Sequence, residues 1–165
     1  MAEPTSDHPL HFQTQYIKDL SFENPNAPEV YGVILQNQPE VSVSIDMRSQ
    51  HLDQRSYEVT LILRVGATVA GKSAFLVDLQ YGALIEVAAE VPEEDIEPLL
   101  LTEGPRFVFP FARSIVADVT REGGFPPLVI NPIDFERFYA RKREAAEKEA
   151  AAREPAAQEE AAPQN

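Results

Sequence analysis

Hydrophobic and polar residues alternate along residues 12–23, and this period of two predicts a half-buried β-strand. The positions expected on its buried face are Phe12, Thr14, Tyr16, Leu20 and Phe22. Asp19 and Glu23 fall on the opposite face, with few basic residues near them. The strand stops in the stretch NPNAP, where turn chemistry outweighs strand propensity. We therefore expect an edge strand that shows acids to solvent, which favours an interaction surface over a reaction centre.

Three further stretches alternate in the same way. They predict strands at 40–48, at 57–69 and from 75 to about 89. A tight connection at 70–72 joins the last two in a hairpin, and Gly82 is expected to mark a bend or a bulge. Residues 51–55 indicate a polar turn. Residues 24–39 indicate a long crossing segment with a short helical turn near 29–31.

The apolar period lengthens to that of a helix after residue 91. The sequence PEEDIE at 92–97 indicates one helix start, because acids are favourable at a helix N-terminus. Pro110 predicts the first turn of a second helix, which Gly123-Gly124 ends. Its apolar stripe consists of Phe111, Ile115 and Val119, widened by Ala112 and Val116. One side of this stripe either meets another subunit or packs on the chain's own sheet, and we expect an oligomer with Ala112, Ile115, Val116 and Val119 at its interface.

An extended apolar connector, FPPLVINP, follows at 125–132. Asn131 is the expected N-cap of the last helix, with Pro132 at its first position. Apolar residues in that helix end at Tyr139, and the charged portion beyond Ala140 is typical of a solvated helix with i, i+4 ion pairs. Pro155 is expected to begin a disordered Ala/Glu/Gln tail.

Together these elements predict an α+β protein, in which a four-stranded antiparallel sheet carries two main helices on one face. Three regions are expected along the chain. Residues 1–11 form a flexible N-terminus, 12–140 one folded domain, and 141–165 a charged helical extension followed by a disordered acidic tail.

Composition narrows the possible functions of this 165-residue chain. It has no cysteine, which excludes disulfides and thiolate chemistry and fits a reducing cytoplasm. No apolar run approaches the ~20 residues that span a bilayer, and no secretory signal precedes the first strand. The net charge of −13 disfavours nucleic acid and anionic membranes as partners and favours basic protein segments.

Candidate catalytic chemistry is sparse. None of His8, His11 and His51 has metal-ligand spacing with another on a formed element. Gly71-Lys72-Ser73 lacks the upstream glycine of a phosphate-binding loop. The acids at 93–97 fit a helix start better than a metal cluster. We therefore expect neither an enzyme nor a metal or cofactor site, and keep a carboxylate-based enzyme as a minor alternative.

Apolar surface is the remaining candidate feature. The connector at 125–130 contains two prolines, stays extended and is hard to bury completely. A groove between this connector, the last helix and the segment at 29–39 would be long and apolar, with accessible backbone. Such a groove suits an extended peptide.

Five stretches, in order along the chain from about Phe12 to Tyr139, resemble the SecB family of bacterial protein-export chaperones. They are IKDLSFENPNAP at 17–28, QPEV at 38–41, FLVDLQYGALIEV at 75–87, FPFAR at 109–113 and GGFPPLVINPIDF at 123–135. The pattern departs from the family at Asn37, where a tryptophan is usual, and at Asp78, where a glutamate is usual. The charged tail also falls outside the resemblance.

The resemblance implies a cytoplasmic homotetramer, a dimer of dimers, that holds unfolded preproteins without ATP. It also implies delivery of these clients to the motor ATPase SecA, whose basic, zinc-binding C-terminal tail docks on the acidic sheet face. The docking residues that it implies are Asp19, Glu23, Leu76 and Asp78. The residues expected in the client groove are Tyr31, Phe111, Phe125, Val129 and Tyr139. A SecB-like chaperone dedicated to a single client, such as an antitoxin, is the alternative.

Overall fold

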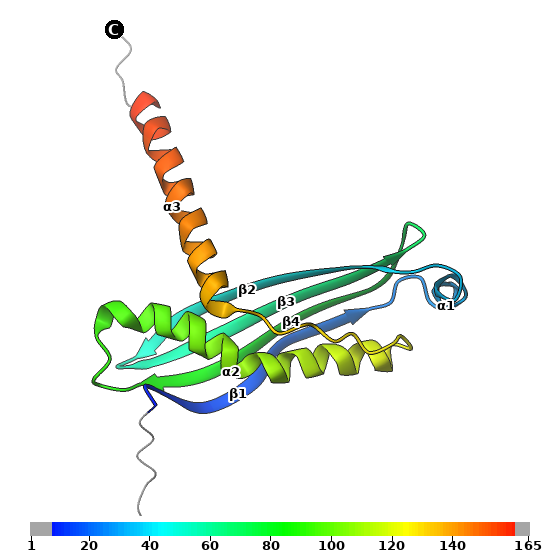
Figure 1. The fold of residues 1–165 in the computed structure, drawn as a ribbon, viewed down its shortest axis with the longest axis horizontal. Coiled ribbons are helices and arrows are strands. Elements are labelled where there is room, and N and C mark those ends of the chain that lie inside the picture. The colour runs from blue at the N-terminus through cyan, green and yellow to red at the C-terminus, as the bar shows by residue number, and fades with distance from the viewer. Residues whose placement is uncertain (1–7, 161–165) are drawn as a thin grey trace, which may run out of the picture. The chain divides into compact units, whose positions relative to one another are not determined.

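The computed structural model describes residues 8–160, with side chains up to residue 152. Two compact units meet in sequence between Asn131 and Pro132, and each is described by itself. The first unit contains β1 (Leu10–Glu23), α1 (Glu29–Ile34), β2 (Glu40–Asp53), β3 (Ser56–Val69), β4 (Lys72–Val87) and α2 (Glu93–Glu122), and the second contains α3 (Phe135–Glu160) (Figure 1). Most of the N-terminus predicted to be flexible lies outside the described residues, although Leu10 and His11 already belong to β1.

The four strands form one antiparallel sheet in the order β1-β4-β3-β2, which confirms the predicted α+β fold. β1 is an edge strand, as the sequence predicts, and β2 is the other edge. Two tight turns join β2 to β3 and β3 to β4. Gln54, Ala70 and Gly71 adopt positive φ in these turns, the conformation that two-residue hairpin connections require. β2 continues to Asp53, so the polar turn predicted at 51–55 is shorter than expected.

The core lies between the sheet and α2. Alternate side chains of the two central strands point to this face, and each buried Leu or Val stabilises the fold by about 1.5–3 kcal/mol. The fully or almost fully buried members are Val59, Leu61, Leu63 and Val65 of β3, Val77, Leu79 and Ile85 of β4, and Val108, Ala112 and Val116 of α2. Figure 1 shows α2 lying across the strands, and it contacts all four of them.

α2 is one helix of 30 residues, which corrects the prediction of two helices, one starting at PEEDIE and the next at Pro110. Pro98, Pro105 and Pro110 all lie inside it, and the helix bends along its length (Figure 1). An internal proline costs ~3 kcal/mol because it removes a hydrogen bond and crowds the preceding turn. Burial of the apolar side chains between the prolines offsets this cost, and Leu100, Leu101, Val108 and Phe109 are all buried.

Two of the four residues predicted at the oligomer interface are buried within the single chain. Ala112 and Val116 have no exposed surface within the single chain, because they face its own sheet. Ile115 and Val119 are only partly buried, so part of each side chain remains exposed on α2. The interface stays a prediction, and Ile115 and Val119 are the two of its four residues that have exposed surface in the single chain.

Two β-bulges correct the predicted face assignment of β1. Its pairing with β4 shifts between Phe12 and Thr14 and again between Ile17 and Asp19. Because the side-chain period of a strand is two, each extra residue reverses the faces that follow it. Thr14 and Tyr16 therefore lie on the face opposite α2, whereas Leu10, Phe12, Leu20 and Phe22 lie on the α2 side.

Gly82 is not a bulge itself, because β4 pairs regularly with both of its neighbours there. It accommodates Tyr16 of the bulged strand instead. A Cβ at Gly82 would lie 2.8 Å from Cε2 of the Tyr16 ring, closer than real Cβ contacts allow. The glycine therefore provides space for a side chain that the bulges turn onto this face.

The second unit begins with an N-cap different from the predicted one. Asp134, not Asn131, caps α3, and its Oδ1 accepts a 3.0 Å hydrogen bond from the Arg137 backbone N–H. Asp134 is a favourable N-cap because its carboxylate accepts a hydrogen bond from one of the backbone N–H groups that have no partner within the first turn of the helix. The expected pair Glu144–Lys148 forms at 2.9 Å.

The helical backbone of α3 continues past Pro155 to Glu160, beyond the helix end expected from the sequence. Alanine and glutamate on both sides of Pro155 favour a helix. The sequence also favours an i, i+4 ion pair between Glu149 and Arg153. This pair stays a prediction, because the Arg153 side chain lies outside the described ones. The last five residues of the predicted disordered tail, 161–165, also lie outside the described residues.

Candidate interaction surface on the open sheet face

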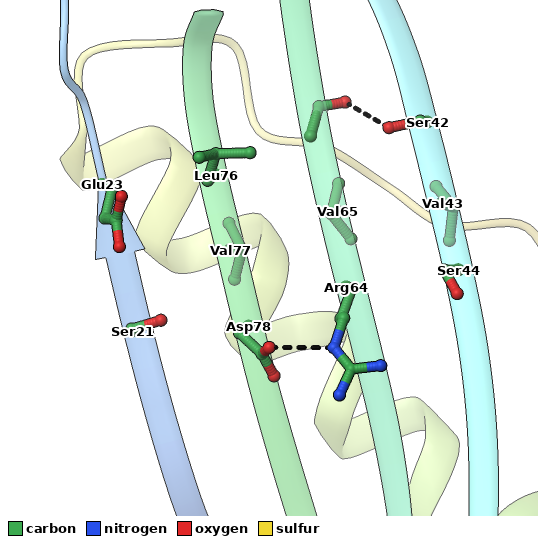
Figure 2. A pocket seen from close by; sticks show the side chains of 11 residues that line it. Ser21, Glu23, Ser42, Val43, Ser44, Arg64, Val65, Leu76, Val77 and Asp78 are labelled. Carbon is green, nitrogen blue, oxygen red and sulfur yellow. Dashed lines mark hydrogen bonds and ion pairs between the residues drawn. The ribbon is translucent and has the colours of Figure 1, made fainter.

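The face of the sheet opposite α2 carries a shallow depression of about 430 Å³ at the end where β1 stops. All four strands contribute to it. The side chains that point into it are Ser21 and Glu23 of β1, Ser42 and Ser44 of β2, Arg64 of β3, and Leu76 and Asp78 of β4 (Figure 2). We call the whole face opposite α2 the open face, and Asp19 lies on it outside the depression. The lining of the depression mixes acids, hydroxyls, one base and one exposed leucine.

The strand register brings the four predicted docking residues together on the open face. Asp19 is opposite Gln80, and Glu23 is opposite Leu76. Ser21, between the two acids, is opposite Asp78. Residues paired across antiparallel strands share a face, so Asp19, Glu23, Leu76 and Asp78 form one patch. Leu76 is 46% exposed, an apolar contact point between the acids.

Arg64 is a member of this surface that the sequence reasoning missed. It pairs with Asp78 across β3 and β4, and its Nε donates to Asp78 Oδ2 at 3.0 Å (Figure 2). Both side chains are substantially exposed, 58% for Arg64 and 38% for Asp78. The second oxygen of Asp78, Oδ1, is buried and has no hydrogen-bond partner among the described residues. The alternation of β3 placed Arg64 on the outer side, but only the register shows which acid it meets.

A second polar cluster lies farther along the same face. Tyr16 Oη donates a short hydrogen bond to Glu58 Oε1, and Lys18 Nζ donates to Oε2 of the same carboxylate. Burial, this hydrogen bond and the charge of Glu58 raise the pKa of Tyr16 to about 12. Burial alone would raise the pKa of the Glu58 carboxyl, but the hydrogen bonds from Lys18 and Tyr16 and the charges of Lys18 and Arg48 hold it below its usual value. The negative charge of Glu58 is therefore balanced within the cluster. The hydrogen bonds of Tyr16 and Lys18 to Glu58 also connect the bulged part of β1 to β3.

The predicted client groove is only partly assembled within the first unit. Tyr31 and Phe125 are neighbours, with ring centroids 5.4 Å apart, and Phe75 packs 5.0 Å from Phe125. Tyr31 Oη donates to the Gly123 carbonyl at 2.7 Å, which fixes this ring beside the end of α2. Phe125 is only 5% exposed, so it packs beneath the surface and does not line an open groove. Val129 is 67% exposed on the connector.

Phe111 does not join this aromatic cluster. Its ring is 6.2 Å from Phe107, which in turn stacks on Phe12 at 3.9 Å. Twelve residues of helix separate Phe111 from Gly123, about 18 Å at 1.5 Å per residue. Tyr139 lies on α3 in the second unit, so its place in the groove stays a prediction.

Val41 and Val43 on β2 are further exposed apolar positions. Val41 pairs with Ala67 and Val43 with Val65, which places both on the α2 side of the sheet. Nevertheless both are more than two-fifths exposed, because they lie on an edge strand. Their period-two pattern gave no sign of this exposure.

The described residues meet the requirements of neither a metal site nor a helix that crosses a membrane. No group of three or more His, Cys, Asp or Glu side chains there could hold a metal ion. None of the helices described has the length and apolar content that a membrane crossing needs.

A sheet with one covered face and one charged open face is the architecture of a protein that presents a binding surface. Comparison with known proteins identifies the family to which this chain belongs. The model of the family "Preprotein translocase subunit SecB" matches residues 3–146. The chain therefore belongs to the SecB family.

Individual relatives agree with the family match. The protein-export protein SecB of Rhodospirillum rubrum is 46% identical over 147 residues, covering 88% of this chain and 90% of the relative. That of Parvibaculum lavamentivorans is 48% identical over 137 residues, covering 83% and 80%. Among solved structures, the Mycobacterium tuberculosis SecB-like chaperone in complex with a peptide from the HigA1 antitoxin has a TM-score of 0.59 at 15% identity, covering 75% of this chain and 90% of that one. This structural likeness shows the fold alone.

Proposed function

We propose that this protein is an ATP-independent chaperone of the cytoplasm that holds unfolded preproteins and delivers them to the translocase motor SecA. The observation that carries the proposal is the patch of Asp19, Glu23, Leu76 and Asp78, which comes from two strands and lies on one face. Three carboxylates around an exposed leucine complement a basic segment with an apolar residue. The basic, zinc-binding C-terminal tail of SecA has this chemistry.

Client holding requires a different surface from docking. Apolar side chains exposed on the α2 side, Val41, Val43 and Val129, supply contact area for unfolded chains. β2 is also an edge strand, so an extended client can add main-chain hydrogen bonds along it. Backbone bonds and shallow apolar contacts tolerate many sequences, which suits a chaperone with a broad client range. A chaperone dedicated to one antitoxin is not favoured, since the relatives named above are protein-export proteins.

We propose that the working particle is a homotetramer, a dimer of dimers. Phe107 and Phe111 are each 45% exposed on α2, and Ile115 continues the same side of the helix. Phe111, expected from the resemblance in the client groove, is here proposed for the interface instead. Exposed aromatic rings in a row are typical of an interface between subunits. Light scattering of the native protein should give about four chain masses, and a stable monomer would contradict the proposal.

Charge reversal tests the docking surface. The triple variant Asp19→Lys, Glu23→Lys and Asp78→Lys should weaken binding of the zinc-loaded SecA C-terminal segment at least about 100-fold in titration calorimetry, because three attractive contacts become repulsive. Suppression of aggregation of an unfolded client should change less than about twofold, since the client surface lies elsewhere.

The matched control reverses three exposed acids outside the open face, Glu90→Lys, Glu97→Lys and Glu122→Lys. It changes the net charge by the same amount and should retain most of the SecA affinity, because charges beyond about 8 Å are screened at physiological salt. Equal affinities of the two triple variants would show that only total charge matters and would overturn the docking surface.

A further inference from the structure

The open face carries a cation of its own among the proposed docking acids. Arg64 lies in the row Ser21, Asp78, Arg64 and Ser44 that crosses all four strands. Its guanidinium is within the depression and points toward Asp78 (Figure 2). A docking surface for a basic segment would be expected to lack such a residue, because it repels the incoming charge and occupies an acid that the partner needs.

The geometry of Asp78 shows what Arg64 does to the acid. Oδ2 accepts the hydrogen bond from Arg64 Nε, and Oδ1 is buried without a partner among the described residues. While Arg64 is in place, neither oxygen is offered freely to a ligand. A partner cation must first displace Arg64, after which the carboxylate can turn toward the partner. The pair is exposed enough for this exchange, since ion pairs at the surface are weakly held.

We propose that Arg64 is a specificity-determining residue of the open face, which competes with a basic partner for Asp78. A segment with a single lysine gains little, because it replaces one ion pair by another. A segment with several basic residues engages Asp19 and Glu23 as well, and this additional attraction compensates for the displacement of Arg64. The displaced guanidinium is 58% exposed already, so water satisfies its donors and it need not contact the partner. The proposal rests on the docking function proposed above.

Arg48 provides a matched control on the same face. It is exposed, and its Nη2 donates to Gln80 Oε1 at 3.0 Å, an amide and not a docking carboxylate. Arg64→Gln and Arg48→Gln therefore remove the same charge from the same face. Only the first of them frees Asp78.

The test uses titration calorimetry of the full-length protein with the zinc-loaded SecA C-terminal segment at physiological salt. Arg64→Gln should tighten binding by about two- to fivefold, the worth of an exposed ion pair. Arg48→Gln should change it by less than about 1.5-fold. In an Asp78→Asn background, Arg64→Gln should change binding by no more than Arg48→Gln does, because the competition has lost its target and only the loss of one positive charge remains. A peptide with a single lysine should gain at least as much from Arg64→Gln as the SecA segment does.

Two failures are distinguishable. If the triple charge reversal described above leaves SecA binding unchanged, the docking surface is wrong and this inference fails with it. If the triple variant loses binding but Arg64→Gln and Arg48→Gln have equal effects, the docking surface stands and Arg64 acts only through total charge. Weaker binding of Arg64→Gln would also overturn the proposal, since Arg64 would then be a contact and not a competitor.

Discussion

The two faces of this sheet are built from the same four strands but differ in the burial and the interactions of their side chains. On the α2 face, side chains such as Leu61, Leu63 and Leu79 are fully buried, and the interactions there are apolar and crowded. On the open face, the outward side chains of the same strands form ion pairs and hydrogen bonds within reach of solvent. Stability therefore resides mainly in the α2 face, whereas the docking proposed above uses the open face, so most variants should affect stability or docking without the other.

The largest expected difference between the two faces is in the free energy of unfolding, and two leucines on β4 test it. Leu79 is fully buried against α2, whereas Leu76 lies on the open face. Leu79→Ala should lower the free energy of unfolding by about 2–5 kcal/mol, because it removes apolar contacts and leaves a cavity. Leu76→Ala should lower it by no more than about 0.5 kcal/mol. Urea denaturation measures both values, and similar losses would show that the faces are not energetically distinct.

A smaller effect is expected where the open face is locally crowded. Gly82→Ala would push the new methyl group into the Tyr16 ring and disturb its hydrogen bond to Glu58. The expected loss of unfolding free energy is about 1–3 kcal/mol. Gly32→Ala is the control, since a methyl group there would meet no atom within 4 Å and alanine favours the helix α1. Thermal unfolding measures the stability of both variants. Equal stabilities of Gly82→Ala and Gly32→Ala would show that the Tyr16 ring is not held in a fixed position against Gly82.

The smallest effect is electrostatic and depends on pH. The folded-state pKa of Glu58 is depressed below 4.5, so its ionised form stabilises the fold above that pH. This contribution is lost as pH falls through the folded-state pKa. Glu58→Gln should therefore lower the free energy of unfolding by about 1 kcal/mol at pH 7, the typical worth of a charge-assisted pair near the surface.

At a pH below the folded-state pKa of Glu58, the wild type and Glu58→Gln should have equal stability, because the carboxyl is then neutral in both folded and unfolded chains. Chemical denaturation across this pH range gives the difference directly. A difference that stayed constant with pH would mean that the shape of Glu58, not its charge, supports the cluster.

The sequence predicts the strands well because period two is a strong local signal. Asp19 and Glu23 could be placed on one side of β1 without a structure, since no bulge falls between them. The bulges before Thr14 and before Asp19 could not be foreseen, because they depend on how β1 pairs with β4. For the same reason Tyr16 was assigned to the wrong face.

Helix α2 shows a second limit of local reasoning. Three prolines predict helix ends, and Pro110 was accordingly interpreted as a start. Burial against the sheet overrides this local preference, which no window of sequence reveals. The pairing of Arg64 with Asp78 is likewise a product of register between β3 and β4, so the acids of the docking patch could be predicted and the base among them could not.

β4 carries both faces in one run of residues, with Leu76 and Asp78 outward and Val77 and Leu79 inward. A deletion of one residue between Ser73 and Leu76 would shift every later side chain to the opposite face. The carboxylate of Asp78 would then enter the core and Leu79 would meet water. Insertions and deletions in this strand are therefore far more damaging than substitutions, and natural length variation should be confined to the turns at its ends.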